Sequence, residues 1–222
     1  MLQASTIIIA DDHPLFRTAL KGTLCAQIAD VSIIEASDLA SLQSCVKEND
    51  KADLILLDLH MPGVEGFSSI IFLNANYPSI PIIVISAHEE NDIIRRAIDH
   101  GANGFLPKSS SAEQIYQAID EVLKGGIWMP AHVSEHPAIE DEEMNAADAI
   151  ASLTPKQFSV GTMVSQGLLN KQIAYELSIT EATVKAHMTE IFRKLGVRSR
   201  TQVVMTFGQL SINPVNSSGR FN

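Results

Sequence analysis

The first 125 residues alternate short β-branched runs with segments of helical period, and this alternation constrains the fold more than any other feature. Strands that are apolar throughout and separated by helices are typical of a parallel sheet covered on both faces. The sequence therefore predicts an α/β fold, a doubly wound (βα)5 domain of flavodoxin-like type. The predicted strands are 6–10, 31–36, 53–58, 81–86 and 104–108, and the predicted helices are 14–27, 38–49, 66–76, 90–100 and 111–124.

The pattern changes after residue 126. The next segment contains two prolines and the acidic cluster 140–143, which together predict a linker. Beyond it the pattern is purely helical, with Thr154 and Ser199 placed as helix caps. We expect the (βα)5 domain at 1–126, an acidic linker at 127–152, a small all-α domain at 153–212 and a disordered tail at 213–222.

Charge is divided unevenly between these parts. Residues 1–152 carry 8 Lys and Arg against 23 Asp and Glu, whereas residues 153–222 carry 8 against 3. A basic module joined to an acidic one is a candidate for binding a polyanion such as nucleic acid. Charge also suggests a further hypothesis, in which the acidic linker contacts the basic module and masks it.

Several features predict a cytoplasmic protein without a membrane partner. No apolar run reaches the roughly 18 residues of a membrane span. The N-terminus lacks the basic region of a signal peptide. Cys25 and Cys45 have no metal-ligand spacing, and their apolar helical context predicts buried, reduced thiols.

Polar side chains follow four of the predicted strands. Asp11 and Asp12 come after the first strand, Asp58 ends the third, Ser86 the fourth and Lys108 the fifth. Because ligands of a doubly wound sheet bind beyond the carboxyl ends of its strands, we expect these groups to converge. Three carboxylates so close repel one another unless a cation lies among them, and Mg²⁺ with oxygen ligands and retained waters suits the set.

The chemistry that this set favours is phosphoryl transfer to a carboxylate. Asp58 would attack phosphorus, the cation would neutralise charge on the transferring oxygens, and Lys108 and Ser86 would bind the phosphoryl group. The alternative is that each acid only caps a strand or helix, as Asp12 could do for the helix near Pro14. Residue by residue that alternative stays open, but the whole constellation favours the phosphoryl site.

Four motifs in residues 6–124 resemble those of the receiver domain of two-component response regulators. They are the acidic pair "DD" at 11–12, "DLHMPG" at 58–63, Ser86 followed by a small Ala87, and "GFLPK" at 104–108. The resemblance implies that Asp58 accepts phosphate from a sensor histidine kinase or phosphotransfer protein. Ser86 stands where Thr is frequent, and this preserves the hydroxyl.

The resemblance also assigns the remaining receiver residues. Asp11, Asp12, Asp58 and the backbone carbonyl of His60 would hold Mg²⁺. Phe105 would be the aromatic switch residue, which becomes buried when Asp58 is phosphorylated. We expect the His60 side chain to be an exposed loop residue.

The basic module has the plan of a helix-turn-helix domain. Its predicted helices are 155–166, 171–177, 181–195 and 200–210, with a tight turn before the third. Within the third, Val184, Met188, Ile191 and Leu195 would form the buried stripe. Groups expected to face DNA are the helix-start residues Asn170, Lys171, Thr180 and Thr183, and the basic residues Arg193, Arg198 and Arg200.

Residues 153–207, and most specifically the run "NKQIAYELSITEATVKAHMTEIFRKLGVRSR" (170–200), resemble the LuxR-type output domain of response regulators of the NarL/FixJ class. The resemblance implies that Lys185 is the main major-groove contact, with Ala186 and Thr189 nearby. It also implies dimerisation through the last helix, by Val203, Val204 and Phe207. The first helix departs from the family, because Gln157 replaces a Glu and Gly161 costs roughly 1 kcal/mol relative to Ala.

Together these features predict a transcriptional regulator of a phosphorelay, switched by phosphorylation of Asp58 and binding double-stranded DNA as a phosphorylation-promoted homodimer. Apart from its own phosphorylation and dephosphorylation it would not be an enzyme. One alternative keeps DNA binding but replaces phosphorylation by a partner or ligand. Another is a small-molecule phosphatase, but position 60 is His where such sites need a second acid.

Overall fold

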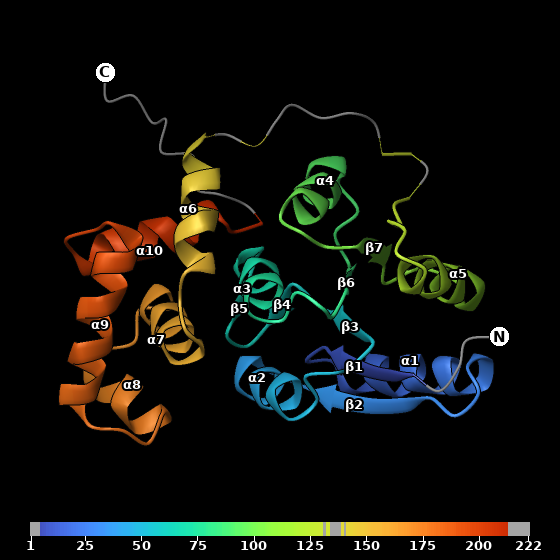
Figure 1. The fold of residues 1–222 in the computed structure, drawn as a ribbon, viewed down its shortest axis with the longest axis horizontal. Helices are drawn as coiled ribbons and strands as arrows, with labels where there is room; N and C mark the ends of the chain where they lie inside the picture. Colours follow the sequence, from blue (N-terminus) through green and yellow to red (C-terminus); the bar gives the residue numbers. More distant parts are fainter. Residues whose placement is uncertain (1–4, 131, 134–138, 140, 213–222) are drawn as a thin grey trace.

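The computed structural model describes residues 5–130, 132, 133, 139 and 141–212. The predicted tail at 213–222 and Glu140 of the acidic cluster lie outside the described residues. A parallel sheet flanked by helices occupies one side of the molecule, and a module made only of helices packs beside it (Figure 1).

The sheet has the predicted doubly wound order. Its five parallel strands are ordered β2-β1-β3-β6-β7. The chain places β2 on one side of β1 and all later strands on the other side, so the strand order reverses at a switch point between β1 and β3. The bounds are β1 (Thr6–Ala10), β2 (Ser32–Ala36), β3 (Leu54–Leu57), β6 (Ile82–Ser86) and β7 (Gly104–Pro107). The flavodoxin-like prediction is confirmed.

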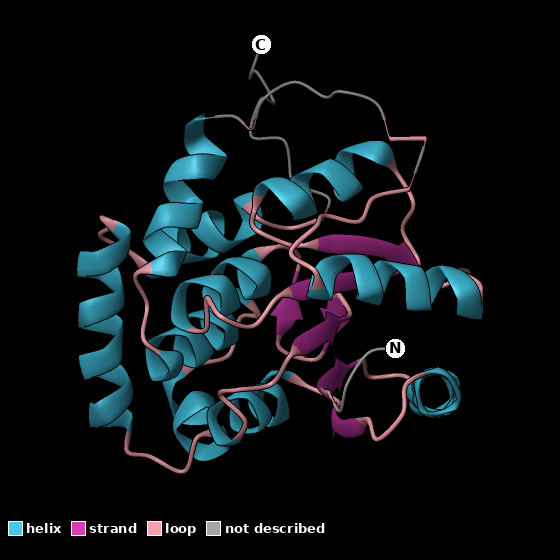
Figure 2. Ribbon diagram, turned by 45° about the vertical axis from the view of Figure 1, so that its right-hand side comes forward, coloured by secondary structure: helices cyan, strands magenta, loops and turns pink. Residues whose placement is uncertain are grey.

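Helices cover both faces of this sheet, as Figure 2 shows. Helices α1 (Pro14–Gln27) and α5 (Ala112–Leu123) share one core with Ile7 and Ile9. Helices α2 (Leu39–Glu48), α3 (Ser68–Asn76) and α4 (Asn91–Asp99) share the other with Ile8 and Ala10. Since side chains alternate along a strand, the uniformly apolar β1 supplies both cores.

A short hairpin follows β3. Strands β4 (His60–Met61) and β5 (Val64–Glu65) pair antiparallel, and Gly63 between them has a positive φ of 80°. The sequence does not predict this hairpin, because two-residue strands carry no periodic signal. It positions the segment directly after Asp58.

The helical module contains one helix more than expected. Helix α6 (Asp141–Ala151) lies within the predicted linker and precedes α7 (Pro155–Ser165), α8 (Asn170–Glu176), α9 (Glu181–Leu195) and α10 (Arg200–Gln209). Ala146 and Ile150, one helical turn apart, are buried. The acidic residues occupy the first turn, where the helix dipole favours them. The linker prediction is therefore wrong for residues 141–151.

The helical module is docked on the sheet domain. The rings of Phe72 and Phe158 stack with centroids 4.2 Å apart, and the backbone N–H of Phe67 donates to the carbonyl of Leu210 over 2.8 Å. One continuous apolar core runs from α3 into α7 and α10. The sequence does not predict that the helical module docks on the sheet domain, because no single residue indicates it.

Two local expectations need correction. Cys25 is exposed on the outer face of α1, and Cys45 is partly buried, so the prediction of two buried thiols is wrong. Gly161 has a packing role beyond its helix-weakening effect, because a Cβ there would lie 2.8 Å from Cζ of Phe207. The glycine lets α7 and α10 approach closely.

Candidate functional site

The predicted acidic pocket forms at the carboxyl edge of the sheet. The ammonium of Lys108, which follows β7, lies 2.7 Å from Asp11 Oδ2 and 2.8 Å from Asp58 Oδ2. Both carboxylates are buried. Burial by itself lowers the pKa of Lys108, but the close contacts with the negatively charged Asp11 and Asp58 outweigh it and leave the pKa raised. Lys108 is therefore a fixed cation between two strand ends.

The acidic pair leaves oxygen atoms suited to a metal ion. Within the described residues, the buried atoms Asp11 Oδ2 and Asp12 Oδ1 accept no hydrogen bond, although Lys108 and His13 lie beside them. One ligand atom from each of Asp11, Asp12, His13 and Asp58 lies within 4.8 Å of the others. Carboxylate oxygens at this spacing fit a hard divalent cation such as Mg²⁺.

Ser86 and the segment after Asp58 complete the pocket. Ser86 is fully buried, and its Oγ accepts a hydrogen bond of 3.1 Å from the backbone N–H of His88. Asp58 Oδ1 accepts one of 3.3 Å from the backbone N–H of His60. The structure thus brings Asp11, Asp12, Asp58 and Lys108 together, and Ser86 lies beside Lys108, whose backbone N–H donates to the Ser86 carbonyl over 2.7 Å.

Two histidines beside the pocket were not predicted as a pair. The rings of His60 and His88 stack with centroids 5.0 Å apart. Partial desolvation of the ring by its neighbours, and after it repulsion from His88, lowers the pKa of His60. His60 is exposed, as expected. The contact could not be read from the sequence, because the two residues follow different strands.

Phe105 is already fully buried, and its N–H donates to the carbonyl of Trp128 over 2.9 Å. The expectation that this side chain becomes buried only on phosphorylation therefore needs correction. The cause is its place in β7, where it points into the core shared with α4.

The stripe that the sequence predicts to face DNA lies on α9. Val184, Met188 and Ile191 are buried as predicted, and Leu195 packs against the same core at partial burial. On the opposite stripe Lys185, Ala186, Thr189 and Arg193 are exposed, as are Lys171, Thr183 and Arg198. In Figure 1, α9 lies at the outer edge of the module, with α7 and α6 between it and the sheet. Docking thus leaves this stripe uncovered.

Some predicted DNA contacts already have partners within the chain. Arg200 donates to Asn170 Oδ1 over 3.3 Å and to the carbonyl of Leu168. Asn170 is the first residue of α8 and not its cap, which is Leu169. The Thr180 hydroxyl caps α9 by accepting from the N–H of Thr183. Arg200 and Asn170 thus tie α10 to α8.

The predicted dimer residues divide between surface and interior. Val203 and Phe207 are buried, Phe207 beside Phe158 of the chain's own α7, whereas Val204 is exposed next to Met205. A helix buries one stripe, and residues one position apart face different directions. Val203 and Phe207 are therefore corrected to core residues, and the exposed apolar surface of α10 consists of Val204 and Met205.

A polar network joins α4 to the helical module. Glu143 of α6 accepts from Arg96 over 2.9 Å and lies 2.6 Å from His100 Nε2. Arg96 also donates to the backbone carbonyls of Gln209, Ser211 and Ile212 at the end of α10. Burial raises the pKa of Glu143, but the hydrogen bonds and charges of His100 and Arg96 prevail and lower it. Glu143 thus pairs with the sheet domain, which contradicts the linker-masking hypothesis for this residue.

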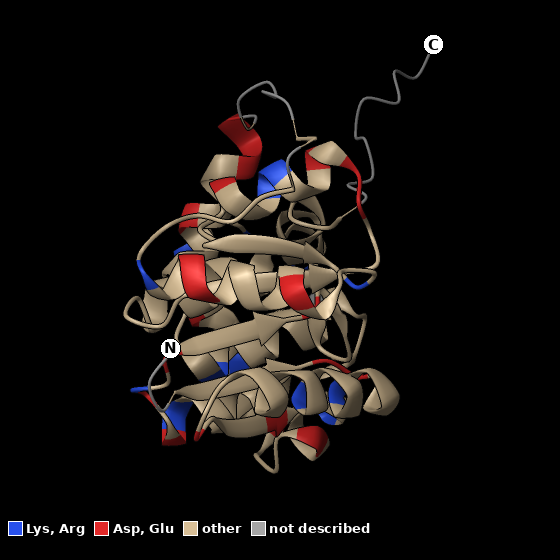
Figure 3. Ribbon diagram, turned by 90° about the vertical axis from the view of Figure 1, so that its right-hand side faces the viewer, with Lys and Arg blue, Asp and Glu red and all other residues tan. Residues whose placement is uncertain are grey.

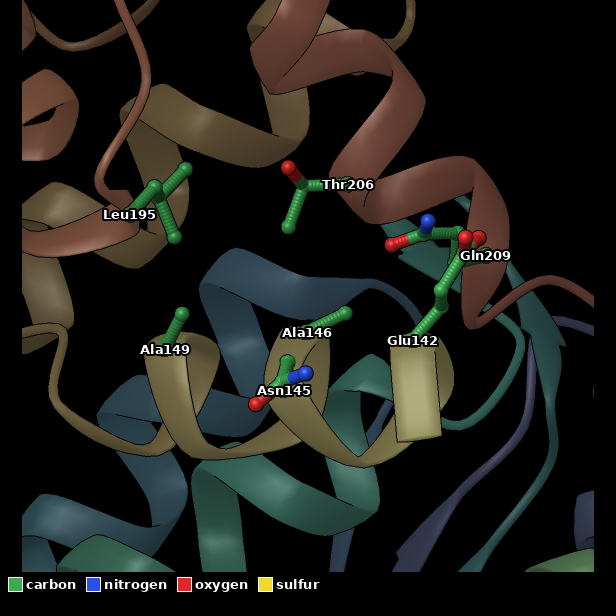
Figure 4. Close-up of a pocket in the computed structure, with 7 residues that line it drawn as sticks. All are labelled: Glu142, Asn145, Ala146, Ala149, Leu195, Thr206 and Gln209. Carbon is green, nitrogen blue, oxygen red and sulfur yellow. The ribbon is translucent and has the colours of Figure 1, made fainter. Parts of the chain in front are cut away.

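A cavity of about 210 Å³ lies on the other side of α6 (Figure 4). Glu142, Asn145 and Ala149 of α6 line it, facing Thr206 and Gln209 of α10. None of its lining residues belongs to the acidic pocket.

Figure 3 shows that acidic positions also lie on the outer helices of the sheet domain. None of the helices in the described part of the chain is long and apolar enough to cross a membrane.

Comparison with known protein families accounts for both parts. Residues 7–120 match the response regulator receiver domain, and residues 151–207 match the bacterial regulatory proteins of the luxR family. The chain therefore belongs to the response regulators that join a receiver domain to a LuxR-type DNA-binding domain. Members of this family regulate transcription, and receiver domains hold Mg²⁺ in an acidic pocket of this kind.

The similarity extends over nearly the whole chain. It is 38% identical to the glycerol metabolism activator of Pseudomonas putida, covering 92% of this chain and 95% of the relative. It is 35% identical to the nitrate/nitrite response regulator protein NarP of Escherichia coli, covering 91% and 94%. Among solved structures, RcsB of Salmonella enterica bound to a promoter is 25% identical, covering 94% and 100%, with a TM-score of 0.56. The chain is a transcriptional response regulator.

Proposed function

We propose that Asp58 is the phosphoacceptor, and that its state controls how the helical module engages DNA. The observation that supports this most is the position of Lys108 Nζ, 2.8 Å from Asp58 Oδ2 and 2.7 Å from Asp11 Oδ2. An ammonium held at this place can bind an oxygen of a phosphoryl group attached to Asp58. The alternative, in which each acid only caps a strand or a helix, poorly explains why these groups converge from three strands.

In the proposed step, an oxygen of the Asp58 carboxylate attacks phosphorus. The bond from phosphorus to the donor's histidine nitrogen breaks, and the nitrogen leaves with the electron pair. Lys108 and the Ser86 hydroxyl then bind the oxygens of the acyl phosphate. Asp11, Asp12, Asp58 and the carbonyl of His60 would hold Mg²⁺, which when bound neutralises charge on the transferring oxygens. A sensor histidine kinase or phosphotransfer protein would be the donor.

The output step would use the contact between α4 and the helical module. Ser86 ends β6, and the chain passes from it through His88 into α4, which carries Arg96. A phosphoryl group that draws the Ser86 hydroxyl toward Asp58 would displace this connection and weaken the contacts of Arg96. The shift is one between pre-existing docked and released arrangements.

Release of the helical module from the receiver would change the orientation of the exposed stripe on α9 and not its accessibility to DNA. Lys185 and its exposed stripe on α9 are uncovered in the docked arrangement. A LuxR-type module reads one half-site, so two modules must align on DNA. We propose a homodimer on double-stranded DNA, joined in part by Val204 and Met205 of α10. Because DNA is the proposed partner, the proposed location of the protein is the cytoplasm.

Labelling with acetyl phosphate tests the phosphoacceptor. The wild-type chain should take up phosphate in proportion to protein when Mg²⁺ is present, and Asp58→Asn should not. Stoichiometric labelling of Asp58→Asn would sink the assignment. A regulator switched by a partner instead would fail to bind beryllofluoride with magnesium, so that measurement separates the two functions. Rapid turnover of a small phosphate ester would instead favour the phosphatase alternative.

A further inference from the structure

His13, which directly follows the acidic pair, places its imidazole beside both carboxylates. Nδ1 lies 3.1 Å from Asp11 Oδ1 and 2.7 Å from Asp12 Oδ1. The first contact is a hydrogen bond whose direction depends on the imidazole tautomer, whereas Asp12 Oδ1 accepts no hydrogen bond among the described residues. His13 occupies the N-cap position of α1, yet its side chain makes no capping bond. Helix capping therefore does not explain its place.

The two distances from His13 match those between neighbouring ligands of one coordination sphere. An octahedral ion with ligand bonds of about 2.1 Å has neighbouring ligand atoms about 3.0 Å apart and opposite ones about 4.2 Å apart. The Nδ1 atom of His13 lies at neighbour distance from Asp11 and Asp12, and all four ligand atoms, including that of Asp58, lie within 4.8 Å of one another. Asp12 Oδ1 is a buried oxygen without a hydrogen-bond donor among the described residues, and a cation bound between it and Nδ1 of His13 would satisfy both atoms.

We infer that His13 is a further protein ligand of the cation site, through Nδ1, and that it sets which metal the site prefers. This inference rests on the proposed cation-assisted function and deepens it. Mg²⁺ favours oxygen ligands, whereas an imidazole nitrogen suits Mn²⁺, Co²⁺ and the later first-row ions. The chain's site should therefore bind Mn²⁺ more tightly, relative to Mg²⁺, than the same pocket without this nitrogen.

Metal titration of the full chain tests the inference. Mn²⁺ and Mg²⁺ are titrated separately into the wild type, into His13→Gln and into His132→Gln, an exposed histidine that serves as matched control. Loss of a nitrogen ligand should weaken Mn²⁺ binding roughly tenfold and Mg²⁺ binding less than about threefold. The control should match the wild type. Equal losses for both ions in His13→Gln, or none, would overturn the inference.

Pulsed electron paramagnetic resonance of the Mn²⁺-loaded wild type gives a second readout. Coupling to a directly bound histidine nitrogen should be present in the wild type and in His132→Gln and absent in His13→Gln. Absence of this coupling from the wild type, or its persistence in His13→Gln, contradicts ligation by His13.

Replacement of Asp12 by Asn separates this inference from the proposed function. If Asp12→Asn abolishes binding of both ions while His13→Gln keeps the wild-type ratio of affinities, only the role of His13 fails. If the wild type binds neither ion, the cation-assisted function fails with it.

Discussion

Arg96 of α4 and Glu143 of α6 form an ion pair of 2.9 Å across the boundary between the receiver and the helical module. Each side chain is only 14% exposed. The same guanidinium binds the carbonyls that end α10, and lies 4.5 Å from the centre of the Phe67 ring. A single receiver residue thus holds both the first and the last helix of the module.

Glu143→Gln should loosen this docking. The amide keeps the shape of the side chain but removes the charge that pairs with Arg96 and His100, and partly buried pairs of this kind contribute on the order of 1–3 kcal/mol. Unphosphorylated Glu143→Gln should bind operator DNA several-fold more tightly than the wild type. Glu142→Gln, on an exposed neighbour, is the matched control. Equal DNA affinity in all three proteins would contradict the docking switch.

The same pair should give stability a pH dependence. The pKa of Glu143 is lowered in the folded chain from an ordinary value of 4.5. A lowered carboxyl pKa contributes stability that is present above the unfolded pKa and lost as the pH falls through the folded one. The melting-temperature difference between the wild type and Glu143→Gln should shrink as the pH falls below about 4.5. A difference that grows toward acid pH would oppose the assignment.

The sequence predicts the pocket better than the docking, for a physical reason. Strand periodicity fixes where each strand ends, and parallel strands bring Asp11, Asp58 and Lys108 to one edge whatever the loops do. Arg96 and Glu143 are 47 positions apart and follow no shared rule, so only the packed structure joins them. The sequence does not predict helix α6, because its acids and the prolines before it outweigh the spacing of its two buried residues.

Phe207 shows the same limit within a single helix. Its apolar character predicted an interface, and the partner proved to be the chain's own α7. Periodicity shows which stripe is buried but not by what. The exposed pair Val204 and Met205 is therefore the part of α10 available to a second chain.

Gly161→Ala should destabilise the helical module, although alanine is the better helix former. A methyl group at this position would lie 2.8 Å from Cζ of Phe207, a side chain only 3% exposed. Overpacking of this kind costs about 1–3 kcal/mol, more than the gain of roughly 1 kcal/mol in helix propensity. Thermal unfolding should show a lower melting temperature. Gly208→Ala, where a Cβ meets nothing within 4 Å, should not lower it.

Lys185 should serve DNA binding and Arg200 the stability of the helical module, although both were predicted to contact DNA. Lys185 is exposed on α9, so Lys185→Ala should weaken operator binding by about 1–3 kcal/mol and leave the melting temperature unchanged. Arg200 is engaged with Asn170 and the carbonyl of Leu168. Because its loss leaves a part-buried carbonyl without its donor, Arg200→Ala should lower the melting temperature first. Thermal unfolding and DNA titration of the two variants check this division. An unchanged melting temperature with strongly weakened binding in Arg200→Ala would show that the arginine leaves its internal partners to bind DNA.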